Sequence, residues 1–119
     1  FTLSRRVREI TCMLDTGDTS SAKIATLPRD ARIIDIVVNV KTAFAGGTTT
    51  LDVGKSSDGD WLIDGVDISA VGKASPTMLQ PGYDENTAML EIYANVGAGN
   101  SAGEVDVTIL FSYGKDTPL

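Results

Sequence analysis

The chain has 119 residues and a net charge of −6 at pH 7, with a single cysteine and no histidine. This length suits one domain, and the acidic balance argues against nucleic acid as a partner, because phosphate binding needs clustered Lys and Arg. The absence of histidine excludes Ser–His and Cys–His nucleophilic catalysis. Cys12 cannot form an intrachain disulfide, and no apolar run reaches the ~18 residues of a membrane span, so no membrane partner is expected.

Alternation of apolar and polar residues with a period of two predicts the first strands. Residues 8–18 place Ile10, Cys12 and Leu14 on one face and end at a Thr-Gly-Asp turn. Cys12 is therefore expected to be a small, buried core residue. A shorter strand over 20–27 ends at a proline, which cannot donate to a sheet ladder.

The stretch 31–42 is predicted to be the central strand, because it is rich in β-branched residues and one of its faces is apolar throughout. Its inward residues are expected to be Ile34, Ile36, Val38 and Val40. A Gly-Gly pair at 46–47 predicts a hairpin turn into a strand over 48–54. Residues 60–69 predict a further strand, with a break at Gly65.

The second half of the chain predicts a long loop and two closing strands. Residues 71–87 contain several Gly and Pro and are expected to form an irregular surface loop. Residues 88–96 and 104–114 alternate strictly, and the glycine-rich stretch 97–103 between them predicts a hairpin connection. Seven or eight strands without helical spacing predict an all-β protein, an antiparallel β-sandwich of jelly-roll-like topology.

The N-terminal end is apolar and then basic. We expect residues 1–19 to form an N-terminal arm and first strand, and residues 20–119 to complete a single sandwich domain. An arm that anchors to an acidic neighbour would use Phe1, Leu3, Arg5, Arg6 and Arg8. The alternative is a solvated terminus that has no partner. The sequence shows no signal peptide. Because it does not begin with Met, residues before Phe1 are expected to have been removed or to be left out of this chain.

Four aspartates lie close together in the sequence around the fifth strand. They are Asp58, Asp60, Asp64 and Asp67. Carboxylates can bind a hard cation such as Ca²⁺, but the spacing does not match an EF-hand loop. The favoured interpretation is a turn at Asp58-Gly59-Asp60 and a second turn or bulge at Asp64-Gly65. No cofactor is expected, and the metal site is the minor alternative.

Three aromatic residues could form a platform for stacking on sugar rings: Trp61, Tyr83 and Tyr93. Trp61 is the only tryptophan, and it stands beside Leu62 and Ile63, which favours a core or interface anchor. Sugar binding would require these rings to face solvent. Because catalytic motifs are also missing, we expect the protein not to be an enzyme.

The order of motifs resembles that of small virion proteins of tailed bacteriophages. These proteins have a Leu-Pro entry, an apolar strand ending in Thr-Ala-Phe, an L-x-V/I-G segment, and then an Asp-rich turn with an aromatic residue. The matching positions here are Leu27, Pro28, Thr42, Ala43, Phe44, Leu51, Val53, Gly54, Asp58, Asp60 and Trp61. The likeness runs from about Leu27 to the last strand, and its motifs are structural.

The resemblance implies a non-enzymatic role as a capsid decoration (cement) protein, a head spike base or a fibre-associated module. The favoured role is a decoration protein on the outer surface of the virion head. It implies binding to the major capsid protein and to copies of the chain itself, as a homotrimer. The interface residues expected outside the N-terminal arm are Tyr83, Met89 and Tyr93, with 71–83 as an exposed or intersubunit loop. The alternative is a tail- or fibre-associated module that binds a receptor or carbohydrate.

Overall fold

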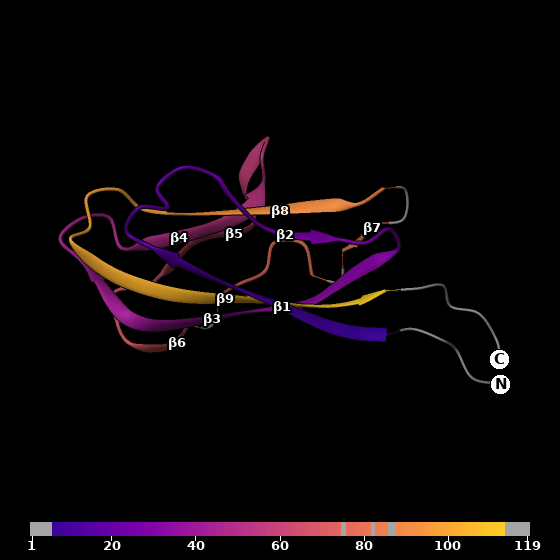
Figure 1. The fold of residues 1–119 in the computed structure, drawn as a ribbon, viewed down its shortest axis with the longest axis horizontal. Helices are drawn as coiled ribbons and strands as arrows, with labels where there is room; N and C mark the ends of the chain where they lie inside the picture. The colour runs from indigo at the N-terminus through magenta and orange to yellow at the C-terminus, as the bar shows by residue number, and fades with distance from the viewer. Residues whose placement is uncertain (1–5, 75, 82, 86–87, 114–119) are drawn as a thin grey trace, which may run out of the picture.

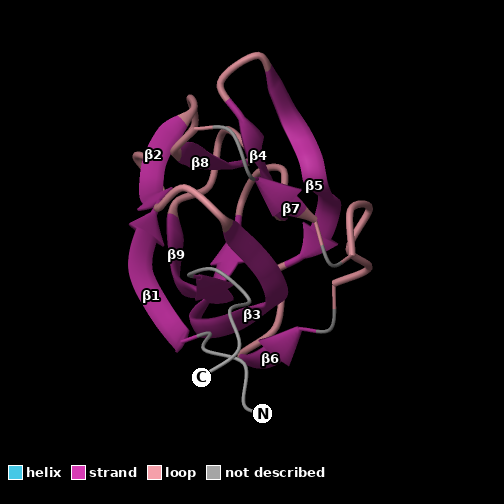
Figure 2. Ribbon diagram, turned by 90° about the vertical axis from the view of Figure 1, so that its right-hand side faces the viewer, coloured by secondary structure: helices cyan, strands magenta, loops and turns pink. Residues whose placement is uncertain are grey.

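The computed structural model describes residues 6–74, 76–81, 83–85 and 88–113. They form nine strands in two packed antiparallel sheets (Figures 1 and 2). The first sheet has the order β1-β9-β3-β6, with β7 also paired to β3; the second has the order β2-β8-β4-β5. The strands are β1 (Arg6–Asp15), β2 (Ala22–Leu27), β3 (Ala31–Ala45), β4 (Thr50–Lys55), β5 (Asp58–Asp67), β6 (Gly72–Ala74), β7 (Asp84–Glu85), β8 (Leu90–Val96) and β9 (Ala102–Tyr113).

The strand pairing is that of a long hairpin rolled into two layers. β1 pairs with β9, β2 with β8, β3 with β6 and β7, and β4 with β5. Rolling then joins β9 to β3 and β8 to β4. This connectivity is the jelly roll, so the predicted fold class is confirmed. None of the described residues forms a helix long and apolar enough to cross a membrane.

The core lies between the two sheets and is built by the alternation seen in the sequence. Every second residue of β8 from Leu90 to Val96 is buried, and so is every second residue of β9 from Val105 to Phe111. Ala88, predicted to point inward with them, lies before β8 and is exposed. Cys12 is only half-buried and packs against the edge of the core, so its predicted full burial is wrong.

One prediction for the central strand is wrong because β3 contains a bulge. The register with β9 shifts between Ile33 and Asp35, and a bulge places one unpaired residue in the strand and moves the following residues to the other face. Ile33 is therefore fully buried, whereas Ile34 is 46% exposed. Ile36, Val38 and Val40 are buried as predicted.

The two glycine-rich loops are not hairpins. Residues 46–49 lead from β3 to β4, and residues 97–101 from β8 to β9, and each pair of strands belongs to different sheets. The loops instead pack against each other at one end of the sandwich. Thr48 N donates to Ala98 O at 3.0 Å, and Asn100 Nδ2 donates to Thr48 O at 2.8 Å. Rolling the chain requires connections that cross between layers, which local turn signals do not reveal.

The predicted loop over 71–87 is only partly irregular. It contains β6, which pairs with Val38–Val40 of β3, and β7, which pairs with Ala31 and Arg32. These short strands cover one edge of β3, and they bring the strand total to nine. Their length, three and two residues, is too short to produce a visible alternation.

Candidate functional site

The β4–β5 hairpin carries the Asp-rich stretch, and its tip stands away from the body of the sandwich (Figure 1). The turn consists of residues 56–57, because Lys55 pairs directly with Asp58. Asp58-Gly59-Asp60 therefore begins β5 and does not form the predicted turn. A two-residue loop is the commonest hairpin connection between antiparallel strands.

A cation lies over the aromatic pair behind this hairpin. The Trp61 and Tyr83 rings meet edge to face, with centroids 4.6 Å apart and an interplanar angle of 84°. Lys55 Nζ is 3.9 Å from the Trp61 centroid and 5.6 Å from that of Tyr83. Both rings pack against the core, which confirms Trp61 as an anchoring residue. Lys55 was not among the predicted site residues, because no short-range pattern signals a cation over a ring.

The three aromatic residues do not form one flat platform. Trp61 and Tyr83 pack against the core, whereas Tyr93 alternates with the buried residues of β8 and so lies on the outer face of that strand. The edge-to-face contact and the Lys55 ammonium occupy the surroundings of the Trp61 ring. Stacking of a sugar on this ring would first require Lys55 to move.

Tyr93 and Met89 line the same groove, of about 300 Å³, between the hairpin and β8. Its lining residues are Lys55, Ser56, Ser57, Met89, Leu90, Glu91 and Tyr93. Tyr93 Oη donates to Glu91 Oε2 at 3.0 Å, and Lys23 Nζ lies 3.4 Å from the same oxygen. These two partners lower the pKa of Glu91. Met89 is 69% exposed, so an apolar side chain stands beside a charged network on this face.

The aspartates have separate structural roles. Asp67 Oδ1 accepts a hydrogen bond from Ser69 N at 2.9 Å, which closes the end of β5. Hydrogen bonds from the side chain and then the backbone of Ser69 lower the pKa of Asp67. Asp52 of β4 accepts from Gly65 N at 2.7 Å. The β4–β5 register shifts at this point, so the predicted bulge at Asp64-Gly65 is confirmed. No group of three or more metal-ligating side chains occurs in the described part of the chain.

Asp58 and Asp60 interact with each other at the start of β5. A side-chain hydrogen bond to Asp60 raises the pKa of Asp58, because two neighbouring carboxyl groups share a proton more readily than they carry two charges. Burial raises the pKa of Asp52, and the charges of Asp64 and Asp60 add to that effect. The hairpin is therefore an acidic surface on which the pKa values of Asp52 and Asp58 are raised.

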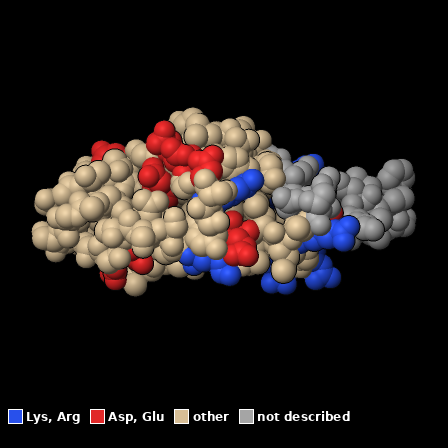
Figure 3. All heavy atoms as spheres, turned by 90° about the horizontal axis from the view of Figure 1, so that it is seen from above, with Lys and Arg blue, Asp and Glu red and all other residues tan. Residues whose placement is uncertain are grey.

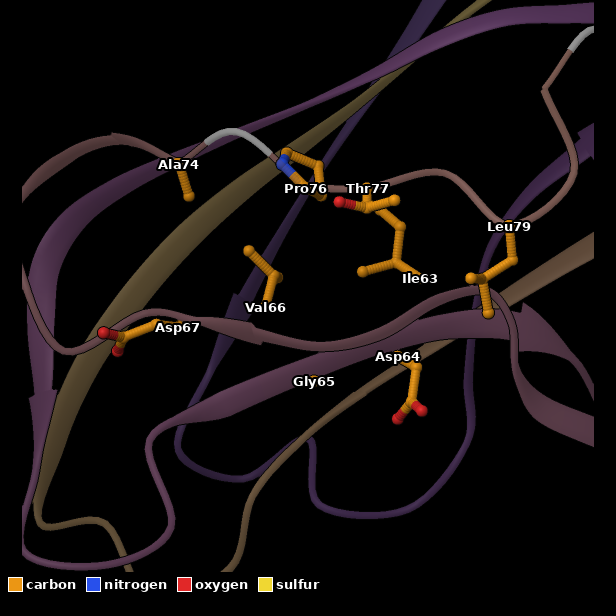
Figure 4. A pocket seen from close by; sticks show the side chains of 9 residues that line it. All are labelled: Ile63, Asp64, Gly65, Val66, Asp67, Ala74, Pro76, Thr77 and Leu79. Carbon is orange, nitrogen blue, oxygen red and sulfur yellow. The ribbon is translucent and has the colours of Figure 1, made fainter.

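A groove of about 610 Å³ lies between β5 and the segment that follows β6. It is lined by Ile63, Asp64, Gly65, Val66, Asp67, Ala74, Pro76, Thr77 and Leu79. In Figure 4 the Val66 side chain points toward Pro76, whereas Asp64 points to the other side of β5. Leu79 N donates to Leu62 O at 2.9 Å and fixes this segment along β5. The segment thus covers the edge of the second sheet.

Arg6 and Arg8 lie within β1, paired with Tyr113 and Phe111 of β9, and both are exposed. They belong to the sheet and not to a separate arm. Phe1, Leu3 and Arg5 lie outside the described residues. Arg8 lines a groove of about 330 Å³ at the end of the sandwich.

No family model and no curated protein sequence matches the chain. Solved structures do match over nearly its whole length. A chain in the acid-stable capsid of Helicobacter pylori bacteriophage KHP30 has a TM-score of 0.74 at 13% identity, over 98% of this chain and 97% of that one.

Two further matches come from other phages. A chain in the capsid asymmetric unit of cyanophage Pam1 has a TM-score of 0.63 at 16% identity, over 96% of this chain and 88% of that one. A chain in the capsid of Ralstonia phage GP4 has a TM-score of 0.62 at 16% identity, over 96% of this chain and 86% of that one. The protein described here shares its fold with these capsid chains.

Proposed function

We propose that the chain is a non-enzymatic structural protein of a tailed-phage virion, a decoration protein bound to the outer surface of the head. The observation that carries this proposal is the fold match to chains of three phage capsids, which in the KHP30 capsid covers 98% of this chain and 97% of the other. Because this match covers nearly all of both chains, neither chain has a large additional domain in the aligned pair, which fits a protein that works as a single module. Fold alone does not imply function, so the motif order from Leu27 to Trp61 is the second support.

The structure suits this role physically. A rolled sandwich buries a continuous core without a disulfide, since Cys12 is the only cysteine. A protein that binds only the assembled shell stabilises it by mass action. Closed symmetry then favours a ring of identical copies where shell subunits meet, and we propose a homotrimer that contacts the major capsid protein.

The proposed interface comprises outward residues of β8 and the residue before it, Tyr83, and the N-terminal end. Its residues are Phe1, Leu3, Arg5, Arg6, Arg8, Tyr83, Met89 and Tyr93. Among them Met89 and Tyr93 share one groove, and Met89 is an exposed apolar side chain of the kind enriched at interfaces.

The first experiment measures the copy number of the chain in purified particles relative to the major shell protein. A ratio near that of the shell subunit supports a decoration protein that covers the lattice. A ratio far below it rejects this role and favours the tail- or fibre-associated receptor-binding module. Sedimentation of the purified chain with shells that lack it then measures binding directly.

The interface is tested with a pair of matched variants. Met89→Asp and Met13→Asp introduce the same charge at exposed methionines, one beside β8 and one on β1 of the other sheet. Met89→Asp and Tyr93→Asp should abolish trimer formation or shell binding, whereas Met13→Asp should retain both. Intact assembly of the Met89 and Tyr93 variants would reject this face as the interface.

A further inference from the structure

A groove of about 330 Å³ lies at the end of the sandwich where β1 begins and β9 ends. Its lining residues are Arg8, Glu9, Ile10, Pro28, Phe111 and Tyr113. Phe111 is buried, and Ile10 and Tyr113 pack against the core. The groove therefore has an apolar floor, with the exposed Arg8 and Glu9 at its rim.

The arginines of the chain occur in two short segments, 5–8 and 29–32. The fold brings both segments to this end, because Ser112 of β9 pairs with Val7 on one side and with Arg32 on the other. Arg6, Arg8, Arg29 and Arg32 are all exposed. Basic side chains gather toward the end of the molecule where β1 begins and β9 ends (Figures 1 and 3).

This positive end stands out on a chain whose net charge is −6. In the β3–β7 register Arg32 lies opposite Asp84, so Arg8 is the arginine that lines the groove itself. Among the groove-lining residues, Glu9 is the acidic one. Arg8 lies 6.0 Å from the centroid of the Tyr113 ring, and hydrogen bonding from Arg8 lowers the pKa of Tyr113. Arg8 therefore places a positive charge beside the aromatic wall of the groove.

We propose that this arginine-rimmed groove binds an acidic segment of a partner protein, in which carboxylates flank an apolar side chain. Arginine binds carboxylates through two parallel hydrogen bonds, and the apolar floor formed by Phe111 and Ile10 accepts the side chain between them. A small inorganic anion would leave that floor in contact with water. A purely apolar segment would remove the guanidinium groups from water without compensation.

The inference rests on the proposed function in one respect, since the partner is taken to be the shell protein. It names the surface and the chemistry of that contact. Electrostatic contacts of this kind depend on ionic strength. The dependence on salt and on one arginine gives the inference its own test.

The probe is a labelled acidic peptide with one central leucine and glutamates on both sides, and the readout is fluorescence anisotropy with the full chain. Arg8→Glu should weaken peptide binding by about tenfold. Lys73→Glu makes the same charge change at an exposed residue of β6, and its affinity for the peptide should stay within about twofold of that of the unmodified chain. The matched peptide with glutamines should not bind. Equal binding to Arg8→Glu or to the glutamine peptide, or no binding to the unmodified chain, would overturn the inference.

Arg8→Gln, which does not introduce a negative charge, provides the second variant if Arg8→Glu unfolds. Sedimentation with shells separates the two proposals. If the unmodified chain and Arg8→Gln both sediment with shells equally, the decoration role stands and the groove is rejected. If the unmodified chain binds the acidic peptide but not shells, the groove stands and the decoration role is rejected.

Discussion

Lys55 Nζ lies 3.9 Å from the centroid of the Trp61 ring, next to the turn of the β4–β5 hairpin. A cation held over an indole face is attracted by the ring quadrupole, and the contribution is about 0.5–1 kcal/mol where the site is partly exposed. Trp61 is the only tryptophan of the chain, so tryptophan fluorescence reports on the surroundings of this one ring.

Lys55→Ala should therefore lower the free energy of unfolding by about 0.5–1 kcal/mol and increase the quenching of Trp61 fluorescence by acrylamide. Urea unfolding and quenching titrations measure these effects. Lys73→Ala, on β6 in the other sheet, should change neither. Unchanged quenching in Lys55→Ala would show that the ammonium does not cover the ring in solution.

Gly65 occupies the bulge of β5 at a φ of 72°, and its amide donates to Asp52. A side chain at this φ is strained although no atom lies within 4 Å of its Cβ position. Gly65→Ala should lower the free energy of unfolding by about 1–2 kcal/mol. Gly59→Ala, in the same strand without a positive φ, should cost no more than about 0.5 kcal/mol. Equal costs in chemical denaturation would contradict this explanation.

Gly103 of β9 lies against the ring of Phe44, with which a Cβ at that position would overlap, and its φ is 152°. Gly103→Ala should lower the free energy of unfolding by about 1–3 kcal/mol, because the core cannot expand around a fully buried ring. Combining it with Phe44→Leu should cost less than the sum of the two single changes, since the smaller side chain relieves the overlap. If the losses in unfolding free energy of the two single variants simply add in the double variant, overlap with Phe44 is not the cause of the Gly103→Ala effect.

Asp58 and Glu91 should give stability changes of opposite sign with pH. The pKa of Asp58 is raised by its hydrogen bond to Asp60, so its ionised form is disfavoured in the folded state. Asp58→Asn should raise the melting temperature at pH 7, and the gain should disappear as pH falls through the folded pKa. The pKa of Glu91 is lowered by Tyr93 and Lys23. Glu91→Gln should lower the melting temperature at pH 7, and the loss should disappear in acid.

Thermal unfolding at several pH values measures both effects in the same assay. Each variant serves as the control for the other, because both side chains are exposed and both changes remove one negative charge. A general effect of net charge would shift both variants in the same direction. Shifts of the same sign would therefore reject the local explanation.

Chelation should not change the melting temperature. The Asp52 and Asp67 carboxylates already accept backbone hydrogen bonds, and Asp58 shares a hydrogen bond with Asp60. Thermal unfolding with and without EDTA measures the effect. A lower melting temperature that recovers with added Ca²⁺ would show that the aspartates bind a cation.

The sequence by itself determined the fold class. Strict alternation along 90–96 and 105–111 encodes one buried and one exposed face locally, because successive side chains of a strand point to opposite sides. The same rule predicted that Met89, just before β8, and Tyr93, within β8, point outward. Trp61 beside two aliphatic residues was correctly predicted to be an anchor.

Only the tertiary structure decided which strands pair and which distant residues meet. The bulge that exposes Ile34 arises from the register between β3 and β9, and the loops at 46–49 and 97–101 cross between sheets because the chain is rolled. The position of Lys55 over Trp61 follows from the register of β4 with β5. Arg8 and Arg32 lie at the same end of the sandwich because β1 and β3 both pair with β9. Local patterns record which face of a strand is apolar. Which strand or sheet packs against that face depends on residues far apart in the chain. The period-two pattern contains no information about that packing.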